Sequence, residues 1–341
     1  MNETFDFAVI GIDHGHIDGQ IDAMTGAGCR FKAFFAANDE LARPFAERYP
    51  DAIRVAEERI ILEDPSIRLV LGAGIPCDRA PMAVRAMRAG KDVMLDKPGC
   101  TTRDQLAELR KVQAETGRIL SICYSEHYRQ RATEAALELV RKGAIGRVIQ
   151  TTGLGPHRIG NYPRPDWFWD PARAGSILTD IASHQFEQFL SLTGATDATI
   201  LHSVESNFDN PGHPEFLDYG HAVVAGGGAT GFVRVDWFTP KGAPVWGDGR
   251  LFIVGTEGTM ELRKYMDIEG RDGGDHLFLT DAKGTRHIDC SAHALPYGPN
   301  LRDDVVNRTA TAMNQEHCFL AMQLALDAHE KAVRIGGERP A

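Results

Sequence analysis

Near its N-terminus the chain reads Phe7-Ala8-Val9-Ile10-Gly11-Ile12-Asp13-His14-Gly15-His16, an apolar run that ends at a glycine. The residues that follow place Ile17, Ile21 and Met24 at i, i+4 and i+7, which is the spacing of an amphipathic helix. A short apolar run that leads through glycine into a helix is typical of the first strand and helix of a parallel sheet. We therefore expect the fold to begin with a buried parallel strand.

The same alternation of strands and helices continues to about residue 123. Further strands are expected over four stretches and helices over three: strands at 31–36, 67–71, 92–95 and 119–123, helices at 41–49, 81–89 and 106–116. Strands that alternate with helices of this length form a parallel sheet with helices on both faces. Residues 1–123 are thus predicted to form an α/β Rossmann domain, a doubly wound parallel sheet that binds a dinucleotide.

The pattern changes after residue 124. A predicted helix over 133–142 is followed by short apolar runs separated by Gly and Asp, at 147–152, 221–224, 231–235, 251–254 and 276–279. Such runs are typical of antiparallel hairpins. Residues 124–341 are predicted to form an α+β domain with a large, mostly antiparallel open sheet, which serves substrate binding and oligomerisation. A last helix over 315–335 can pack back on the first domain.

Apolar side chains in this second domain also predict self-association. The strands carry more apolar residues than one face of a sheet can hide against helices, namely Val233, Val235, Trp237, Phe252 and Val254. An apolar open face usually buries itself against a second copy. A homodimer or homotetramer is the expected assembly.

Composition excludes several classes of partner. The 341 residues include 37 Lys and Arg against 47 Asp and Glu, a net charge of −10, and no basic stretch stands out, so nucleic acid is not an expected partner. No apolar run reaches the roughly 18 residues of a membrane span, and the N-terminus lacks the features of a signal peptide. Six scattered cysteines without a CxxC pair suit a reducing compartment. The expected location is the cytoplasm.

The turn at residues 11–16 lies where a dinucleotide fingerprint G-x-G-x-x-G would be found, but only Gly11 is in register. Asp13 and His16 occupy the other two glycine positions. Two interpretations remain open. Asp13 is either the N-cap of the first helix, or part of an altered cofactor turn in which Gly15 allows close approach and His14 or His16 donates to phosphate.

The end of the second strand lacks the acid that usually binds the ribose hydroxyls. Ala36 stands where that acid is expected, and Asn38 is the nearest polar side chain, either a cofactor ligand or a turn residue. The choice between NAD and NADP therefore stays open.

Two further segments bear chemistry. The apolar run 92–95 leads directly into Asp96-Lys97-Pro98, which delivers a lysine to the carboxyl edge of a parallel sheet, where ligands of this architecture bind. A helix predicted to continue to Leu192 places Asp180 one turn before His184. An Asp in that position can orient an imidazole that acts as a general base, although an ordinary solvated helix face has the same spacing.

Taken in order, these segments resemble the glucose–fructose oxidoreductase / inositol dehydrogenase / rhizopine catabolism (Gfo/Idh/MocA) family along almost the whole chain. Asp96-Lys97-Pro98 matches the family's E-K-P, and Ile75-Pro76-Cys77 its T-P-N. Ala174-Gly175, Asp180 and His184 match G-G-x-x-x-D-x-x-x-H. The chain departs from the family at Asp13, Ala36 and Asp96, which weakens the match mainly at the cofactor.

The resemblance implies an oxidoreductase that uses NAD or NADP and acts on a sugar, polyol or inositol. It implies that Lys97 touches both cofactor and substrate, and that Asp180 and His184 handle the hydroxyl proton during hydride transfer. The candidate cofactor-binding residues are Gly11, Ile12, Asp13, His14, Gly15, His16, Asn38, Ile75, Pro76 and Lys97. The candidate substrate-binding residues are Lys97, Tyr124, Glu126, His157, Trp167, Asp180 and His184.

Three other readings remain. The same fold could serve a lyase or glycosidase that uses bound NAD without net redox change, or a non-catalytic dinucleotide or sugar sensor. A metal centre could draw on second-domain side chains, namely His157, Asp180, His184, His213 and His221. No pair of these histidines has close ligand spacing on one helix, so no metal is expected.

Overall fold

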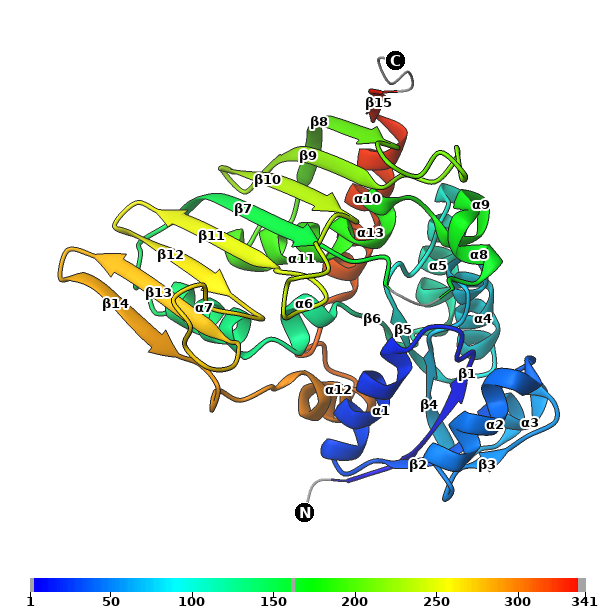
Figure 1. The fold of residues 1–341 in the computed structure, drawn as a ribbon. Coiled ribbons are helices and arrows are strands. Elements are labelled where there is room, and N and C mark those ends of the chain that lie inside the picture. Colours follow the sequence, from blue (N-terminus) through cyan, green and yellow to red (C-terminus); the bar gives the residue numbers. More distant parts are fainter. Residues whose placement is uncertain (1–2, 161–162, 337–341) are drawn as a thin grey trace. The chain divides into compact units, whose positions relative to one another are not determined.

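The computed structural model describes residues 3–160 and 163–336. The chain divides into two compact units (Figure 1). Unit 1 comprises residues 1–123 and 296–319, and unit 2 comprises residues 124–295 and 320–341. Each unit is built around a sheet of its own.

Unit 1 contains a six-stranded sheet in the order β3-β2-β1-β4-β5-β6. Every pair of neighbouring strands is parallel, which confirms the predicted doubly wound sheet. The strands are β1 (Asp6–Ile10), β2 (Arg30–Phe35), β3 (Ile53–Arg54), β4 (Ile67–Gly72), β5 (Asp92–Asp96) and β6 (Leu120–Cys123). The strand order reverses between β1 and β4, and ligands of such sheets bind outside the carboxyl ends of the strands at that point.

The helices of unit 1 are α1 (His16–Gly26), α2 (Asp39–Arg48), α3 (Glu58–Glu63), α4 (Pro76–Arg88), α5 (Arg103–Thr116) and α12 (Tyr297–Asn307). The apolar stripe predicted for α1 is confirmed, since Ile17, Ile21 and Met24 are all buried. Helix α4 begins five residues before the predicted start at Pro81. Pro76 occupies the first turn, where a missing N–H is tolerated, and the helix continues through Pro81.

The segment 296–319 clusters with unit 1, whereas the sequence analysis assigned it to the second domain. Helix α12 packs against α1, and the space beside Gly298 is so narrow that a Cβ there would lie 2.2 Å from the carbonyl oxygen of Ala23. Gln315, the first residue of α13 (Gln315–Glu330), hydrogen bonds to both the N–H and the carbonyl of Leu120 at 2.9 Å. Contacts between residues so far apart in the sequence leave no local signal in it.

Unit 2 contains a nine-stranded sheet in the order β14-β13-β12-β11-β7-β10-β9-β8-β15. Most neighbours are antiparallel, as predicted, but β10 pairs with β7 and β15 with β8 in parallel. The strands are β7 (Val148–Pro156), β8 (Ala198–Ser206), β9 (Tyr219–Gly226), β10 (Ala229–Asp236), β11 (Arg250–Gly255), β12 (Gly258–Arg263), β13 (His276–Asp281), β14 (Gly284–Asp289) and β15 (Val333–Arg334). The last helix was predicted to reach 335, but it ends at Glu330 because Val333 and Arg334 join the sheet edge beside β8.

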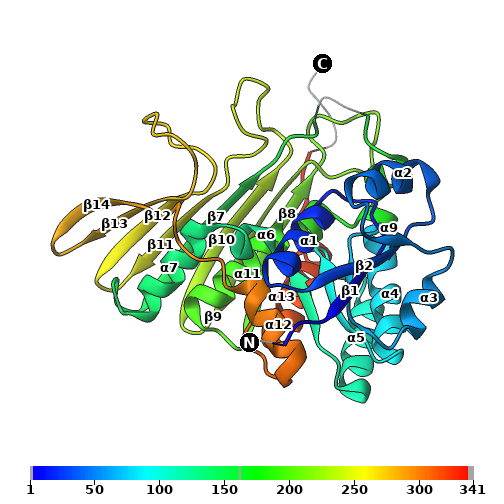
Figure 2. The ribbon, with the colours of Figure 1, turned by 90° about the horizontal axis from the view of Figure 1, so that it is seen from below.

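Helices cover one face of this sheet and leave the other open (Figure 2). Helix α11 (Ala182–Thr193) packs against β7, β9 and β10, and α7 (Arg131–Arg141) packs against β12 and β13. Unit 2 also contains shorter helices: α6 (Ser125–Tyr128), α8 (Asp166–Trp169), α9 (Pro171–Ala174) and α10 (Ile177–Asp180). Val233 and Val235 point to the covered face and are buried.

Side chains at the alternate positions lie on the open face. Paired positions on neighbouring strands form a row that crosses the sheet: Val223, Phe232, Thr152, Phe252, Glu261 and Phe278. All six are only partly buried. The apolar residues named in the sequence analysis therefore divide between the two faces, with Val233 and Val235 on one and Phe252 and Val254 on the other.

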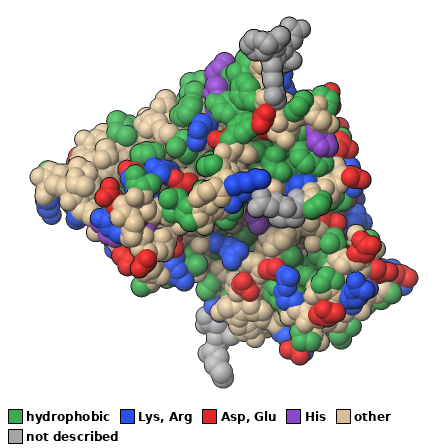
Figure 3. Space-filling view, viewed as in Figure 1, with side chains coloured by type: hydrophobic (Ala, Val, Ile, Leu, Met, Phe, Trp, Pro, Cys, Tyr) green, Lys and Arg blue, Asp and Glu red, His purple; other side chains and the backbone are tan. Residues whose placement is uncertain are grey.

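On the face shown in Figure 3, Lys and Arg side chains are interspersed with Asp and Glu. Within residues 3–160 and 163–336, no helix is both long and apolar enough to cross a bilayer.

The turn after α12 is organised by one buried carboxylate. Asp304 accepts hydrogen bonds from the hydroxyls of Thr309 and Thr311 and from the backbone N–H groups of Thr311 and Ala312, at 2.6 to 2.8 Å. Its side chain is 1% exposed. These bonds fix the chain that leads from α12 into α13.

We predict that Asp304→Ala lowers the free energy of unfolding by on the order of 3 kcal/mol, because it leaves several buried donors without an acceptor. The neighbouring Asp303→Ala removes a half-exposed carboxylate paired with Arg302 and should cost less than about 1 kcal/mol. Denaturant unfolding of the three proteins checks this. Equal losses for the two variants would contradict the assigned role of Asp304.

Candidate active site

The turn after β1 is closed against the turn after β4. Gly11 has φ +85°, and a Cβ at this position would lie 2.9 Å from the Cα of Gly74. Backbone hydrogen bonds run from Gly11 N–H to Phe35 and from Ala73 N–H to Gly11, each 3.1 Å. Only glycine fits both this backbone angle and this space. Gly11 therefore allows the turns after β1 and β4 to meet at the point where the strand order reverses.

Asp13 does not cap the first helix, so that interpretation is wrong. The N-cap of α1 is Gly15, which offers no side chain. The reason is that His14 N–H donates to the carbonyl of Ala73 at 2.9 Å, which holds the chain beside the β4 turn and delays the start of the helix to His16. The partly buried Asp13 carboxylate lies beside the same turn, and a Cβ at Gly74 would come within 3.7 Å of its Oδ2.

His14, His16 and Asp96 form a cluster at the carboxyl edge of the unit 1 sheet. The Nδ1 atoms of His14 and His16 each lie 3.0 Å from an oxygen of Asp96, Oδ2 and Oδ1 respectively. The two imidazole rings meet edge to face, with their centroids 4.2 Å apart. Because both Nδ1 atoms face Asp96, any contact of these histidines with a phosphate would use Nε2.

Arg79, on α4, is the buried cation behind this cluster. Its Nη2 lies 3.1 Å from Asp96 Oδ2, and both side chains are 1% exposed. Its Nε donates to the carbonyl of Gly74 at 2.8 Å, and its Nη1 donates to the carbonyls of Lys97 and Pro98. Sequence reasoning missed Arg79, because an arginine on an amphipathic helix usually points to solvent.

The cluster changes the acidity of its members. Burial raises the pKa of Asp96, but His16, Arg79 and His14 outweigh it and hold that pKa well below its usual range. Burial, helped by repulsion from His16 and opposed by attraction to Asp96, lowers the pKa of His14 to about 4. At neutral pH, Asp96 is therefore ionised and His14 is neutral.

Lys97 follows β5 directly, as predicted, and its side chain is buried. The Lys97–Pro98 peptide bond is cis. The carbonyl of Lys97 is bound by Arg79, so the backbone that carries this lysine is fixed by the same guanidinium that holds Asp96. Thus one buried arginine positions both residues of the Asp96-Lys97 motif.

The remaining predicted cofactor residues occupy defined backbone positions. Asn38 is the N-cap of α2, where its Oδ1 accepts a hydrogen bond from Glu40 N–H at 2.8 Å. This is the turn role that the sequence analysis gave as the alternative to cofactor binding. Ala36 at the expected acid position is buried. Ile75 is the N-cap residue of α4 and Pro76 its first helical residue.

In unit 2 the predicted Asp180–His184 helix is interrupted. Ser176 forms a capping box with Thr179 at the start of α10, which ends at Asp180, and α11 begins after Ile181. The N–H of His184 donates to Ile181 at 3.2 Å, so the turn between the two residues is tighter than a continuous α-helix. Asp180 is partly buried and His184 is 1% exposed.

Tyr124, a predicted substrate ligand, lies beside His184. Their rings meet edge to face with centroids 6.1 Å apart. Further along the same helix face, Glu187 is fully buried and accepts a hydrogen bond from the hydroxyl of Ser191 at 2.6 Å. Burial therefore excludes the solvated-face reading of the His184 helix.

Glu126, a predicted substrate ligand, forms a buried ion pair with Lys264. Lys264 Nζ lies 2.7 Å from one of its oxygens and the hydroxyl of Tyr265 donates to the other at 3.1 Å. Lys264 also donates to Gln188 on α11 at 2.9 Å. Burial raises the pKa of Glu126, but Lys264 and its other partners hold it below its usual value. Sequence reasoning missed Lys264, which no motif marks.

His157 and Trp167 lie in unit 2 on different elements. His157 follows β7, and its Nδ1 lies 3.1 Å from the carbonyl of Gly155, while its ring meets that of Trp246 at 4.4 Å. Trp167 is partly buried in α8. Trp246 is 45% exposed and is an aromatic surface beside His157 that the sequence analysis did not single out.

The second-domain histidines do not form the metal centre considered from the sequence. His213 stacks on Trp169 with a centroid distance of 3.9 Å, and His221 lies 6.0 Å from His202. Among residues 3–160 and 163–336, the group of three His, Cys, Asp or Glu side chains whose ligand atoms gather within 4.8 Å is His14, His16 and Asp96 in unit 1.

A second buried network surrounds His127. Its Nδ1 lies 2.9 Å from both oxygens of Glu187, and its Nε2 lies 3.4 Å from Glu134. Burial lowers the pKa of His127, but the two carboxylates outweigh it and raise the pKa to about 9. Glu187 is one turn beyond His184 on α11, so this network anchors the helix that carries the predicted base.

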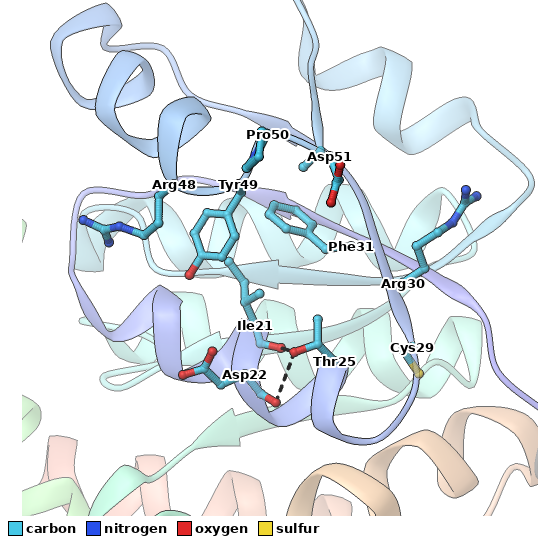
Figure 4. A pocket seen from close by; sticks show the side chains of 11 residues that line it. Ile21, Asp22, Thr25, Cys29, Arg30, Phe31, Arg48, Tyr49, Pro50 and Asp51 are labelled. Atoms are coloured by element: carbon cyan, nitrogen blue, oxygen red, sulfur yellow. Dashed lines mark hydrogen bonds between the residues drawn. The ribbon is translucent and has the colours of Figure 1, made fainter.

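A pocket of about 440 Å³ opens on unit 1 (Figure 4). Side chains of α1, β2 and the end of α2 line it, among them Arg30, Arg48, Tyr49 and Asp51. Within it, the Thr25 hydroxyl is bonded to backbone carbonyls of α1. None of the predicted site residues lines this pocket, so it is not the candidate active site.

Comparison with known proteins identifies the family. The model of the GFO/IDH/MocA C-terminal domain matches residues 133–261. A crystal structure of an oxidoreductase from Erwinia carotovora atroseptica is 41% identical, with a TM-score of 0.95, over 97% of this chain and all of that one. The chain belongs to the Gfo/Idh/MocA family.

Other similar proteins share less of this sequence. Scyllo-inositol 2-dehydrogenase (NADP(+)) IolW of Bacillus subtilis is 26% identical over 58% of this chain and 54% of its own. A structure of levoglucosan dehydrogenase in complex with NADH and levoglucosan has a TM-score of 0.72 and 21% identity, over 98% of this chain and 92% of that one. The matches to the first curated Gfo/Idh/MocA relatives span 39% to 63% of the relatives' length.

The pKa of His127 leads to a pH-dependent stability. In an unfolded chain this pKa is near 6.5, so protonated His127 stabilises the folded state fully below pH about 6.5, and the contribution is lost as pH rises through about 9. We compare the free energy of unfolding of the native protein with that of His127→Asn. The difference between the two should be roughly 3 kcal/mol larger at pH about 6 than at pH about 10.

Denaturant unfolding across this pH range checks the expectation. Glu187→Gln removes the main negative charge beside His127. The stability of this variant should therefore depend less on pH than that of the native protein, as for His127→Asn. A difference between the native protein and His127→Asn that stays constant with pH would show that His127 does not titrate as assigned.

Proposed function

We propose that the protein is an NAD(P)-dependent oxidoreductase that transfers hydride between a nicotinamide cofactor and a hydroxyl group of a sugar, polyol or inositol-like compound. The observation that carries the proposal is Lys97, fixed by Arg79 at the carboxyl end of β5 in a sheet of Rossmann order. Relatives in the same family that are named inositol and levoglucosan dehydrogenases support the substrate class.

The unit 1 turn fits a dinucleotide. Gly11 allows the turns after β1 and β4 to approach closely at the switch point. The space beside Gly15 is open, since no atom would lie within 4 Å of a Cβ there. The residues that would hold the cofactor are Gly11, Ile12, Asp13, His14, Gly15, His16, Asn38, Ile75, Pro76 and Lys97. Asp13 and Ala36 differ from the usual fingerprint, so neither NAD nor NADP is favoured over the other.

When bound, the nicotinamide ring supplies the hydride acceptor for alcohol oxidation. In the proposed mechanism His184 takes the proton of the substrate hydroxyl, and Asp180 orients the imidazole. Lys97 donates to the same oxygen and stabilises the negative charge that develops on it. Reduction uses the same groups in reverse. Tyr124, His157 and Trp167 are proposed to contact the substrate, whereas Glu126 would act through its ion pair with Lys264.

The test is an assay of the purified protein with NAD or NADP and a panel of polyols, inositols and glycosides. Net formation of NADH or NADPH supports the proposal. Product without net redox change would assign a lyase or glycosidase, and ligand binding without turnover would assign a sensor. We place the reaction in the cytoplasm, on the grounds given by the sequence.

The proposed assembly is a homodimer or homotetramer through the open face of the unit 2 sheet. Phe232, Phe252 and Phe278 lie in one row across that face and are only partly buried. Association with a second copy would remove this apolar surface from water.

We predict that Lys97→Met folds normally and lowers turnover by on the order of 10²-fold or more, because the variant keeps the side-chain length and loses the donor. Lys111→Met, an exposed lysine on α5, is the matched control and should keep full turnover. Steady-state kinetics and circular dichroism of both variants check this. Near-normal turnover of Lys97→Met would exclude the proposed site.

A double-mutant cycle tests whether Lys97 and His184 act on the same substrate. Groups that serve one transition state are strongly non-additive, so Lys97→Met and His184→Asn together should lose far less than the product of their separate losses. Fully additive losses in kcat/KM would mean that the two residues act independently.

The proposed interface predicts that Phe252→Asp shifts the protein to monomers in light scattering at micromolar concentration. The charge would have to be buried without a partner in the assembly. Phe208→Asp replaces an aromatic residue outside the row, 43% exposed, and should leave the assembly unchanged. A native protein that is monomeric would remove the basis of the proposal.

A further inference from the structure

Three side chains from separate places in unit 1 gather at the carboxyl edge of its sheet. His14 comes from the turn after β1, His16 is the first residue of α1, and Asp96 is the last residue of β5. One potential ligand atom from each lies within 4.8 Å of the others. Two imidazoles and a carboxylate are the donor set of many three-ligand metal sites.

The spacing suits one small cation. Each Nδ1 lies 3.0 Å from a carboxylate oxygen of Asp96. Two ligand atoms that each lie about 2.0–2.2 Å from one ion are about 3 Å apart at a right angle and about 3.4 Å apart at the tetrahedral angle, so the cluster needs only a small adjustment to hold an ion. The two rings lie at 87° to each other, and their Nδ1 atoms contact different oxygens of the carboxylate.

The cluster is supported from behind and open in front. Asp96 is almost fully buried and is held by Arg79, which matches the hydrogen-bonded second layer that orients metal-ligating carboxylates. The side chains of His14 and His16 are 29% and 33% exposed. An ion on these three side chains would keep coordination positions for water or for an oxygen of a ligand.

Charge alone does not attract a cation here. Arg79 neutralises Asp96, and the charge of Lys97 acts on His14 as well. Binding must therefore come from the imidazole nitrogens, which favour zinc, cobalt and nickel, whereas magnesium and calcium require oxygen ligands.

We propose that His14, His16 and Asp96 form a binding site for a first-row transition-metal dication such as Zn²⁺. One of the three ligands, His16, stands at the third glycine position of the usual turn. The inference uses unit 1 alone and does not depend on the proposed reaction. It also departs from the sequence analysis, which expected no metal.

The test is titration of the chelator-treated full chain with Co²⁺, followed by visible absorption, and with Zn²⁺ in competition. The native protein should bind one ion per chain with a d–d spectrum free of thiolate charge-transfer bands, and Mg²⁺ should not compete. His14→Ala and His16→Ala should each weaken binding by at least about tenfold. His317→Ala, a histidine of α13 outside the cluster, should leave binding unchanged.

Asp96→Asn should also abolish binding, but it disrupts the buried pair with Arg79 and can destabilise the fold. His16→Ala, at a partly exposed position, then decides the question, and circular dichroism confirms that the variant is folded. The proposal is overturned if the native protein binds neither ion, if the His14→Ala/His16→Ala double variant binds Co²⁺ as tightly as the native protein, or if the spectrum shows thiolate ligands.

Discussion

The buried ion pair between Arg79 and Asp96 is the interaction on which unit 1 depends at its functional edge. One guanidinium binds the Asp96 carboxylate and the carbonyls of Gly74, Lys97 and Pro98. It thereby joins the turns that follow β4 and β5. Removal of one partner of such a pair costs about 3–5 kcal/mol, because the other charge is left buried and uncompensated.

In unit 2, buried charged and polar side chains likewise hold α11 in place. Gln188 and Glu187 of this helix take part in two buried networks, one with Lys264 and Glu126 and the other with His127. Because each buried charge has an opposite partner, the networks fix the rotation and position of the helix that carries His184.

Local signals account for most of the first unit. Apolar runs predicted β1, β2, β4, β5 and β6, because strands buried on both faces have a continuous apolar sequence. The two-residue strand β3 and the short helix α3 have no such signal, and Ile53 is even 62% exposed. Lys97 could be predicted because a strand and a motif point to it, whereas Arg79 and Lys264 could not, because burial of a cation depends on partners distant in sequence.

The sequence by itself determined the parallel sheet, the change to an antiparallel sheet after residue 124, and the motifs at Lys97, Asp180 and His184. Each of these follows from side-chain periodicity or from residues close together in the chain. Only the tertiary structure decided that Gly15, and not Asp13, is the N-cap of α1. The same holds for the ion pair of Glu126 with Lys264 and for the contacts of His14 and His16 with Asp96. The physical reason is that these outcomes depend on hydrogen bonds and charges brought together across tens of residues, which no local pattern encodes.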